Sequence, residues 1–291
     1  MSDYDLSKRA KAEPDGSRYT VFDWSKLDEA VSFFKPVEGE INRFDLVPYK
    51  IKTKNHPLVV SNQLGIGDPD YSFEYWVHKN IGPTKKTVLC INRMYGRDCP
   101  ICDASKAFKE DGDDKSAKAC WPSLRVIYNI KTKDGKMQVF DVSDHLFGKA
   151  FKAVQATENE DGATFLAADL KKGKTVVFTA KHVKKDNIEF TEFEGMTLKE
   201  RKVPVTEEDA SKSISFDELV TVYTTEQIDA LFHGGTVEEE DTPPPEEEKK
   251  PVKHEDDVPS CPSGHTFGKD NDKFTECEDC KVWKACIKAS K

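Results

Sequence analysis

Four residues of the kinds that bind metal ions lie within a short part of the chain: His78, Cys90, Cys99 and Cys102. Zinc in structural sites is held by four nitrogen and sulfur ligands, and two of these commonly come from a C-x2-C turn such as Cys99-Pro100-Ile101-Cys102. The alternative is four unrelated residues with a disulfide between two of them, but so tight a turn suits a metal better than an unstrained disulfide. The spacing therefore predicts a structural zinc site. Because all four ligands come from the protein, it leaves no position for a catalytic water.

A second group of candidate ligands lies near the end of the sequence. It consists of Cys261, Cys277, Cys280 and Cys286, with His265 as the alternative fourth ligand. The Cys277-x2-Cys280 pair again has zinc spacing, and the alternative is a tail with oxidisable thiols. The chain has 8 cysteines, and only Cys120 lies outside these groups. We expect Cys120 to be a buried structural thiol.

The charge of the chain is unevenly distributed. Its 291 residues carry a formal net charge of -9, which by itself would argue against a nucleic-acid partner. However, residues 237–260 hold ten acidic side chains and only three lysines, whereas residues 78–136 hold thirteen Lys or Arg against seven Asp or Glu. A protein of negative net charge can present a basic face on one module. The region around the first zinc motif is therefore suited to a polyanionic partner.

Hydropathy and composition favour a soluble, folded protein. The 37% hydrophobic and 10% aromatic content supports a core. The sequence has no run of about 18 apolar residues that could span a membrane, and its first residues lack the apolar segment of a secretory signal. We therefore expect a cytoplasmic location. In that reducing compartment, cysteines more often bind metals than form disulfides.

Composition divides the chain into four parts. Residues 1–20 form a polar, partly basic arm. Residues 21–236 carry nearly all the β-branched and aromatic side chains and form the predicted core, with a zinc subdomain at about 73–120. Residues 237–260 combine three consecutive prolines with acidic blocks, which predicts an extended linker. Residues 261–291 form a small Cys-rich module around the second candidate zinc site.

Strand patterns dominate the predicted core. Alternation of apolar and polar residues predicts strands at 42–51, 123–131 and 137–142, with a tight Asp134-Gly135 turn between the last two. A further hairpin is predicted from 174–183 and 187–193. Short antiparallel strands interrupted by a zinc-bearing insertion are typical of an α+β protein. The fold that we predict is a five-stranded oligonucleotide-binding β-barrel (OB-fold).

Helices are fewer than strands in the predicted core. One is predicted at 144–156 and another at 215–233. The second would begin with a capping box formed by Ser215 and Glu218 and end at Gly234-Gly235.

The spacing patterns of common enzymes are missing from the sequence. Gly65-Ile66-Gly67 lacks the third glycine and the following helix of a dinucleotide site. Residues 111–114 (Asp-Gly-Asp-Asp) could bind a divalent ion, but they lie in a polar segment that is better interpreted as a solvated turn. We therefore expect a protein that is not an enzyme.

Aromatic and basic residues alternate in and around the first zinc motif. Stacking rings and phosphate-binding cations together are typical of proteins that bind single-stranded nucleic acid without sequence preference. Tyr95 is the strongest stacking candidate, because a sequence so rich in polar residues is not expected to be buried. The candidate contacts are Trp76, Lys85, Lys86, Arg93, Tyr95, Arg97, Trp121, Arg125, Tyr128, Lys131 and Lys133.

The order of these motifs resembles the single-stranded DNA-binding proteins of T-even-like bacteriophages. The likeness rests on His78, Cys90 and the Cys99-Pro100-x-Cys102 turn, followed by two apolar strands and the Phe147-Gly148-Lys149 segment. It covers about 20–233. The resemblance implies an OB-fold barrel with an inserted zinc subdomain of one His and three Cys. It also assigns Tyr95 to the place of a DNA-binding tyrosine.

The resemblance further implies a function and partners. Such a protein would coat and protect single-stranded DNA during phage replication, recombination and repair, in the cytoplasm of the infected bacterium. Replication and recombination proteins would bind its acidic segment or C-terminal module, and the protein would associate with itself on DNA. The chain departs from the family in two places: residues 7–11 only approximate the family's basic N-terminal motif, and the T-even version lacks the module at 261–291. The alternative function is a zinc-containing nuclease or a transcription accessory factor.

Overall fold

The computed structural model describes residues 21–27, 30–158, 167–185 and 188–234. The predicted arm at 1–20, the linker at 237–260 and the module at 261–291 lie outside the described residues. The same holds for the second set of candidate zinc ligands, namely Cys261, His265, Cys277, Cys280 and Cys286. Within the described part of the chain, no helix combines the length and apolarity needed to cross a membrane.

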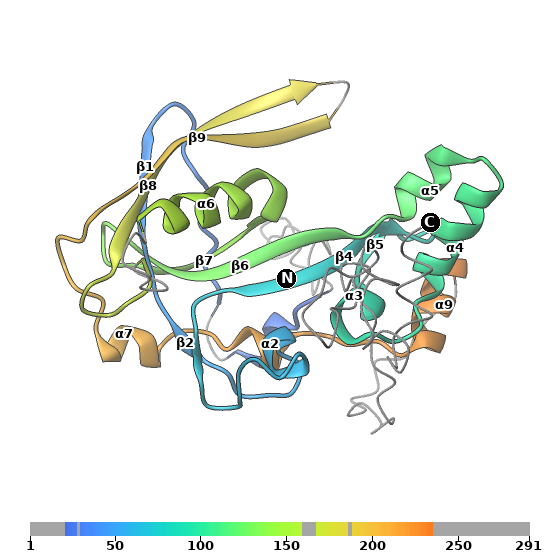
Figure 1. Ribbon diagram of the computed structural model, residues 1–291, viewed down its shortest axis with the longest axis horizontal. Helices are drawn as coiled ribbons and strands as arrows, with labels where there is room; N and C mark the ends of the chain where they lie inside the picture. Colours follow the sequence, from blue (N-terminus) through green and yellow to red (C-terminus); the bar gives the residue numbers. More distant parts are fainter. Residues whose placement is uncertain (1–20, 28–29, 159–166, 186–187, 235–291) are drawn as a thin grey trace, which may run out of the picture. The chain divides into compact units, whose positions relative to one another are not determined.

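The described residues form a mixed α+β structure (Figure 1). Its strands are β1 (Ile41–Leu46), β2 (Tyr49–Lys50), β3 (Pro69–Asp70), β4 (Phe73–Ile81), β5 (Lys86–Leu89), β6 (Ser123–Thr132), β7 (Met137–Ser143), β8 (Lys174–Lys185) and β9 (Ile188–Glu200). Its helices are η1 (Trp24–Lys26), α2 (Pro57–Val60), α3 (Ile91–Tyr95), α4 (Pro100–Glu110), α5 (Asp114–Cys120), η2 (Asp144–Gly148), α6 (Lys149–Glu158), α7 (Glu207–Ser211), α8 (Phe216–Leu219) and α9 (Thr225–His233).

A seven-stranded sheet carries the fold, and its strand pairs are antiparallel. Its order is β5-β4-β6-β1-β8-β9, and β7 pairs with β6. Arg125 in β6 pairs with Tyr75 of β4 and with Ser143 of β7, so these two strands lie on opposite edges of β6. The long strand β6 therefore joins the β4–β5 hairpin to the remaining strands. β2 and β3 form a separate two-stranded sheet.

The five-stranded OB-fold barrel that the sequence predicted is not confirmed, because no pairing between described strands closes the sheet. The outer edge of β7 is occupied by another segment. The Phe34 N–H donates to the Val139 carbonyl at 2.8 Å, and the Val139 N–H donates to the Ser32 carbonyl at 2.9 Å. These backbone groups of β7 are therefore not available to β9.

Most predicted strands agree with the structure. β6, β7 and the β8–β9 hairpin match the predictions at 123–131, 137–142 and 174–193, although residue 187 lies outside the described residues. The predicted strand at 42–51 is interrupted between β1 and β2 at Pro48. Because proline has no N–H group for a β-ladder, a break there is physically reasonable.

The helix predicted at 215–233 is wrong as a continuous element. Residues between α8 and α9 are extended, since Val220 pairs with Phe22 and the Thr221 N–H donates to the Val21 carbonyl at 2.8 Å. The Ser215 hydroxyl donates to the Lys50 carbonyl and does not cap α8. The capping box instead starts α9, at Thr224 and Gln227. Gly234 ends that helix with φ 90, as predicted.

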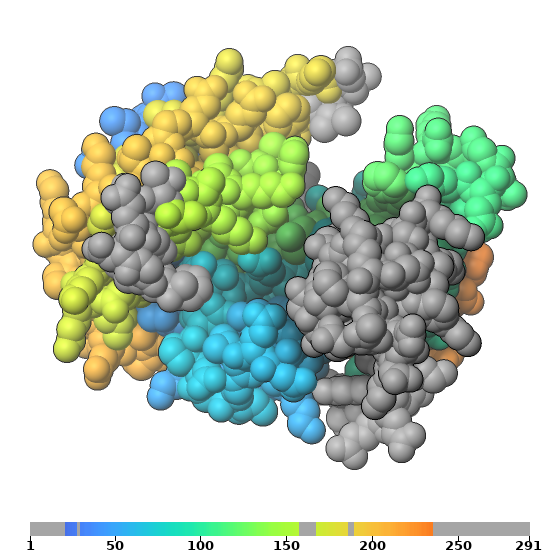
Figure 2. All heavy atoms as spheres, viewed as in Figure 1, coloured from blue at the N-terminus to red at the C-terminus, as the bar shows by residue number. Residues whose placement is uncertain are grey.

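The two largest apolar clusters among the described residues lie on the sheet. The first, which we call the phenylalanine core, is built around Phe44, Phe140, Phe147, Phe151 and Phe178. Helix α6 supplies Phe151 and lies beside β6 and β9 (Figure 1). The second cluster joins β4 to residues 21–22 and 216–220. The space-filling surface is hollowed between the β8–β9 hairpin and the lobe formed by α4 and α5 (Figure 2).

Candidate metal centre

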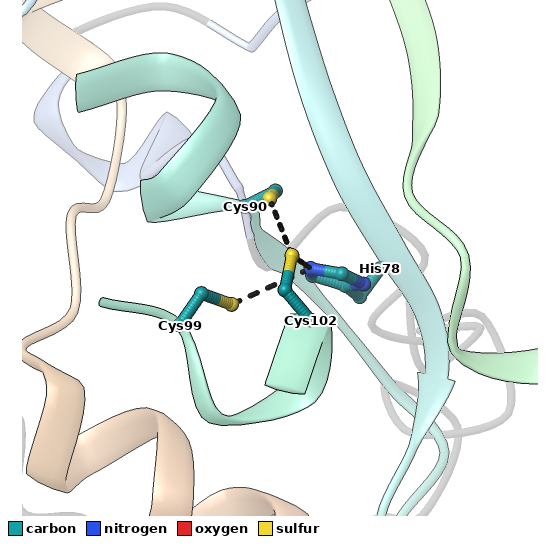
Figure 3. A group of neighbouring side chains, drawn as sticks. All are labelled: His78, Cys90, Cys99 and Cys102. Carbon is teal, nitrogen blue, oxygen red and sulfur yellow. Dashed lines mark hydrogen bonds between the residues drawn. The ribbon is translucent and has the colours of Figure 1, made fainter. Parts of the chain in front are cut away.

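The four predicted zinc ligands lie together (Figure 3). His78 is on β4, and Cys90 follows β5 at the start of α3. Cys99 precedes α4, whose first residue is Pro100, and Cys102 lies in the first turn of that helix. Proline suits the first position of a helix because its missing N–H needs no partner there. The Cys-Pro-Ile-Cys sequence thus starts a helix and directs two thiols to one side.

The distances within this cluster fit a single tetrahedral ion. The His78 Nε2 atom lies 3.5 Å from the Cys99 sulfur and 3.6 Å from the Cys102 sulfur, and the Cys90 and Cys102 sulfurs are 3.5 Å apart. Ordinary Zn–N and Zn–S bond lengths give edges of roughly 3.6 Å for N to S and roughly 3.8 Å for S to S in a tetrahedron. All ligand atoms lie within 4.8 Å of one another. The cluster could therefore hold a metal ion such as zinc.

The orientation of the His78 ring on β4 is set by a backbone group at the end of helix α5. Its Nδ1 atom lies 2.7 Å from the carbonyl oxygen of Cys120, at the end of α5. Since a carbonyl only accepts hydrogen bonds, Nδ1 carries the proton and Nε2 is left as the metal ligand. Cys120 is buried, as predicted, and its backbone is what serves the site.

Protonation of the cluster depends on its own members. Burial lowers the pKa of His78, but hydrogen bonds and charge from Cys90 and Cys99 raise that pKa overall, to about 9. Hydrogen bonds with Cys102 and Cys90 hold the pKa of Cys99 far below its usual range, whereas hydrogen bonds with Cys90 and Cys99 raise that of Cys102. A bound metal ion takes the place of the protons that these groups would otherwise share.

The cluster is enclosed by apolar residues. His78, Cys90 and Cys99 are buried. Ile228 and Leu231 of α9, together with Tyr223 just before this helix, pack around the cluster. The Thr225 hydroxyl, at the start of α9, donates to the Asp98 carbonyl at 2.9 Å. We call residues 78–120 together with α9 the metal lobe. Four protein ligands in a buried setting are typical of a structural site.

Within the described ranges, no second group of His, Cys, Asp or Glu side chains is arranged to hold a metal ion. The acidic segment at 111–114 forms the turn between α4 and α5, and Asp113 caps α5 by accepting the Ser116 N–H at 3.0 Å. This agrees with the predicted solvated turn.

Among the predicted nucleic-acid contacts, two pairs lie at α3: Arg93 of this helix is over Trp76 of β4, and Arg97, just after the helix, is over Tyr95 at its end. The Arg93 guanidinium lies 5.6 Å from the Trp76 ring centre, and the Arg97 guanidinium lies 5.3 Å from the Tyr95 ring centre. Arg93 is exposed and the other three side chains are half-buried. We call these four residues the α3 strip.

Tyr95 is less exposed than its sequence neighbours suggested. Its hydroxyl donates to the Asn55 carbonyl at 3.2 Å, and its ring packs against two apolar clusters. Burial raises the pKa of Tyr95 well above its usual range. The expectation that a polar sequence would keep Tyr95 out of the interior is therefore wrong in part. Its stacking role stays a prediction.

Three other candidates are occupied within the fold. Tyr128 is only 1% exposed and lies in the phenylalanine core, so no base can reach its ring without unfolding. Arg125 forms an ion pair with Asp141 at 2.8 Å, and Lys131 forms one with Asp209 at 2.8 Å. Burial therefore contradicts a stacking role for Tyr128, whereas the DNA contacts of Arg125 and Lys131 stay predictions that these ion pairs make less favourable.

The remaining candidates lie at the surface, away from such partners. Trp121 is 55% exposed, with the Lys109 ammonium 5.9 Å from its ring centre. Lys85 and Lys133 are exposed and Lys86 is half-buried.

Sequence reasoning missed the contributions of Cys120 and Asn55 to this region. Both act through backbone carbonyl oxygens on side chains that are 42 and 40 residues away in sequence. Every residue has such a carbonyl, so no sequence signal marks these contacts. No family model matches this chain, and a comparison with curated proteins found no similar sequence.

Proposed function

We propose that this chain is a non-enzymatic protein that binds single-stranded DNA without sequence preference, with a structural zinc ion at the His78 and Cys90 cluster. The observation that carries this proposal is the α3 strip. An arginine stacked on a ring keeps N–H donors at its edge for phosphate, while the aromatic rings offer partly exposed faces to bases. The metal lobe supports the strip because Cys90 lies at the start of α3.

Strand order supports an OB-type reading of the sheet. Five strands follow the sequence β7-β6-β1-β8-β9 across the sheet, and α6 lies between β7 and β8 along the chain. The OB-fold is a partly open five-stranded Greek-key barrel that binds oligonucleotides. On this reading residues 78–120 of the metal lobe lie in an insertion between the first two barrel strands, β1 and β6, and α9 joins them from beyond the last barrel strand, β9.

The wider role that we propose is coating of single-stranded DNA during phage replication, recombination and repair. It follows from the resemblance of the metal-binding motif, and it includes replication and recombination proteins as partners. The four-protein-ligand cluster supports a non-catalytic role, because hydrolytic zinc sites keep a position for water.

Titration of a labelled oligo(dT) strand tests the proposal. We expect tight binding to the single strand, weaker binding to duplex, and a strong decrease with salt concentration. Incubation of the complex with magnesium should leave the oligonucleotide intact. Degradation would instead favour the nuclease alternative, and the absence of any binding would contradict the proposal.

Substitutions in the α3 strip test the assigned surface. Arg93→Ala should make the log-log salt dependence of binding shallower by about 0.7, the value for one phosphate contact on a single strand. Tyr95→Ala should weaken binding by about 1–3 kcal/mol through loss of stacking without changing that slope. Tyr95→Phe is the matched control, since it removes only the hydroxyl that bonds Asn55. Metal content verifies that each variant retains the lobe.

A further inference from the structure

We propose that the loop at 52–55 forms a second, preformed part of the single-strand-binding surface, with Lys54 contacting a backbone phosphate. This inference rests on the proposed function and extends it to a segment outside the zinc motif. The loop leads into α2, whose N-cap is His56. It is joined to the α3 strip by the hydrogen bond from Tyr95 to the Asn55 carbonyl.

The backbone of the loop is held by hydrogen bonds to a buried carboxylate. Asp217 is 0% exposed, and its Oδ2 atom accepts the backbone N–H groups of Lys52 at 2.9 Å and Thr53 at 2.5 Å. The Thr53 hydroxyl donates to the Asp217 carbonyl at 2.9 Å and accepts the Asn55 N–H at 3.2 Å. The backbone conformation of the loop is thus determined before any ligand binds. A preformed loop lowers the entropic cost of binding.

Charge on this face fits a polyanion. The Arg97 guanidinium lies 5.3 Å from the Tyr95 ring centre, and the loop bonded to Tyr95 through Asn55 carries two further cations, Lys52 and Lys54. Lys52 is paired with Glu218 at 2.7 Å, which reduces its availability. Lys54 is exposed and has no ion pair among the residues that the structure describes. Lys54 is therefore the cation of the loop that is best placed to meet a phosphate.

A sugar-phosphate backbone that follows the α3 strip would meet this loop next. The Asn55 carbonyl accepts a hydrogen bond from the hydroxyl of Tyr95, the residue that we assign to stacking, and Lys54 precedes Asn55 in the chain. Proteins that bind single strands combine stacking rings with cations that track the phosphates. The loop therefore supplies a phosphate-binding cation beside the stacking ring.

Substitution of Lys54 tests the phosphate contact in the full-length, metal-bound protein. Titration of fluorescein-labelled oligo(dT) at several salt concentrations should show weaker binding by Lys54→Ala and a log-log slope that is shallower by about 0.7. Lys54→Arg should retain the wild-type slope. Lys171→Ala is the matched control, because Lys171 is an exposed lysine in the turn before β8, and it should behave as the wild type. A wild-type slope in Lys54→Ala would overturn the inference.

A second variant tests the bracing of the loop. Thr53→Val keeps the shape of the side chain but removes both hydrogen bonds of its hydroxyl. Since Lys54 keeps its charge but not its fixed position, we expect lower affinity with an unchanged salt slope. Unchanged affinity would refute the preformed loop. Thermal unfolding and metal content, measured on the same samples, show whether the whole fold has been affected.

The outcomes separate this inference from the proposed function. If the wild-type protein does not bind oligo(dT), the proposed function itself fails. If it binds, and Arg93→Ala makes the slope shallower while Lys54→Ala does not, the function stands and only the role of the loop is refuted.

Discussion

The metal lobe and the phenylalanine core are stabilised in different ways. The phenylalanine core is a continuous set of buried rings in which Phe147 contacts Phe140, Phe178 and Phe193 with ring centres 5.0, 5.4 and 5.1 Å apart. In the metal lobe the corresponding cluster is smaller, and two of the four candidate ligands, Cys90 and Cys99, are themselves among its buried members. With a metal ion bound as we propose, the lobe would depend on that ion, whereas the sheet depends on many apolar contacts.

This difference predicts independent failure of the two regions. Loss of such an ion would remove a cross-link between β4, the start of α3 and α4, which the few apolar residues of the lobe would not replace. Loss of one ring from the phenylalanine core leaves a cavity but keeps every metal ligand in place. Each of the following experiments is directed at one region and measures the other as its control.

Removal of a metal ligand should have the largest effect. Cys99→Ser should lose one metal ion per chain and increase amide hydrogen exchange throughout the metal lobe, because structural zinc contributes about 10–16 kcal/mol of apparent binding energy in small domains. Exchange in β1 and β8 should stay slow. Cys120→Ser is the control, since only the backbone carbonyl of that residue serves the site and the metal should be retained. Equal metal content in both variants would show that Cys99 is not a ligand.

Truncation in the phenylalanine core should come next. Phe147 is 1% exposed, and Phe147→Ala should lower the free energy of unfolding by about 3–5 kcal/mol through lost burial and cavity formation. Chemical denaturation measures this change. Metal content should remain that of the wild type, and release of the metal in this variant would mean that the two regions unfold as one unit.

A smaller effect is expected where α9 meets the lobe. Gly82 has φ +66, and a Cβ atom there would clash with the Leu231 carbonyl oxygen. Gly82→Ala should therefore lower the free energy of unfolding by about 1–3 kcal/mol through overpacking, in addition to the cost of the strained backbone conformation. Gly135→Ala is matched for backbone strain, with φ +75, but has open space around the added atom. Equal destabilisation of the two variants in thermal unfolding would argue against tight packing of α9.

The smallest effect concerns the ion pair between Lys131 and Asp209. Burial would raise the pKa of Asp209, but hydrogen bonds from Lys131 and Thr206 lower it overall. A lowered carboxyl pKa stabilises the fold above about pH 4, and this stabilisation is lost as the pH falls through the folded-state pKa. Lys131→Met should thus lower the free energy of unfolding by about 1 kcal/mol at pH 7, with a smaller loss in acid. An equal loss at both pH values would implicate packing instead.

The same variant also tests whether Lys131 contacts DNA. Because Lys131 is engaged by Asp209, Lys131→Met should leave the salt slope of oligo(dT) binding unchanged. A shallower slope would show that Lys131 contacts the DNA despite its ion pair with Asp209.

The ligand set could be predicted from the sequence because its chemistry is local. Thiols separated by two intervening residues in a Cys-Pro-Ile-Cys turn must lie near each other in any helix start, and His78 and Cys90 are brought together by a short hairpin, β4–β5. The hairpin strands could likewise be predicted from the alternation of apolar and polar residues. The Asp134-Gly135 turn could be predicted because glycine readily adopts a positive φ, which is 75 at Gly135.

Tertiary structure decided the rest, since burial and partner choice depend on residues distant in the chain. In the sequence, Tyr128 and Tyr95 are both aromatic residues with basic neighbours. In the structure, Tyr128 is enclosed by the phenylalanine core, whereas the Tyr95 hydroxyl donates to the Asn55 carbonyl. Likewise, the helix predicted at 215–233 is interrupted because Val220 pairs with Phe22, nearly the whole length of the described chain away. Local pattern determines which groups are present and how the chain turns, but only the packed fold determines which of them are left to meet a ligand.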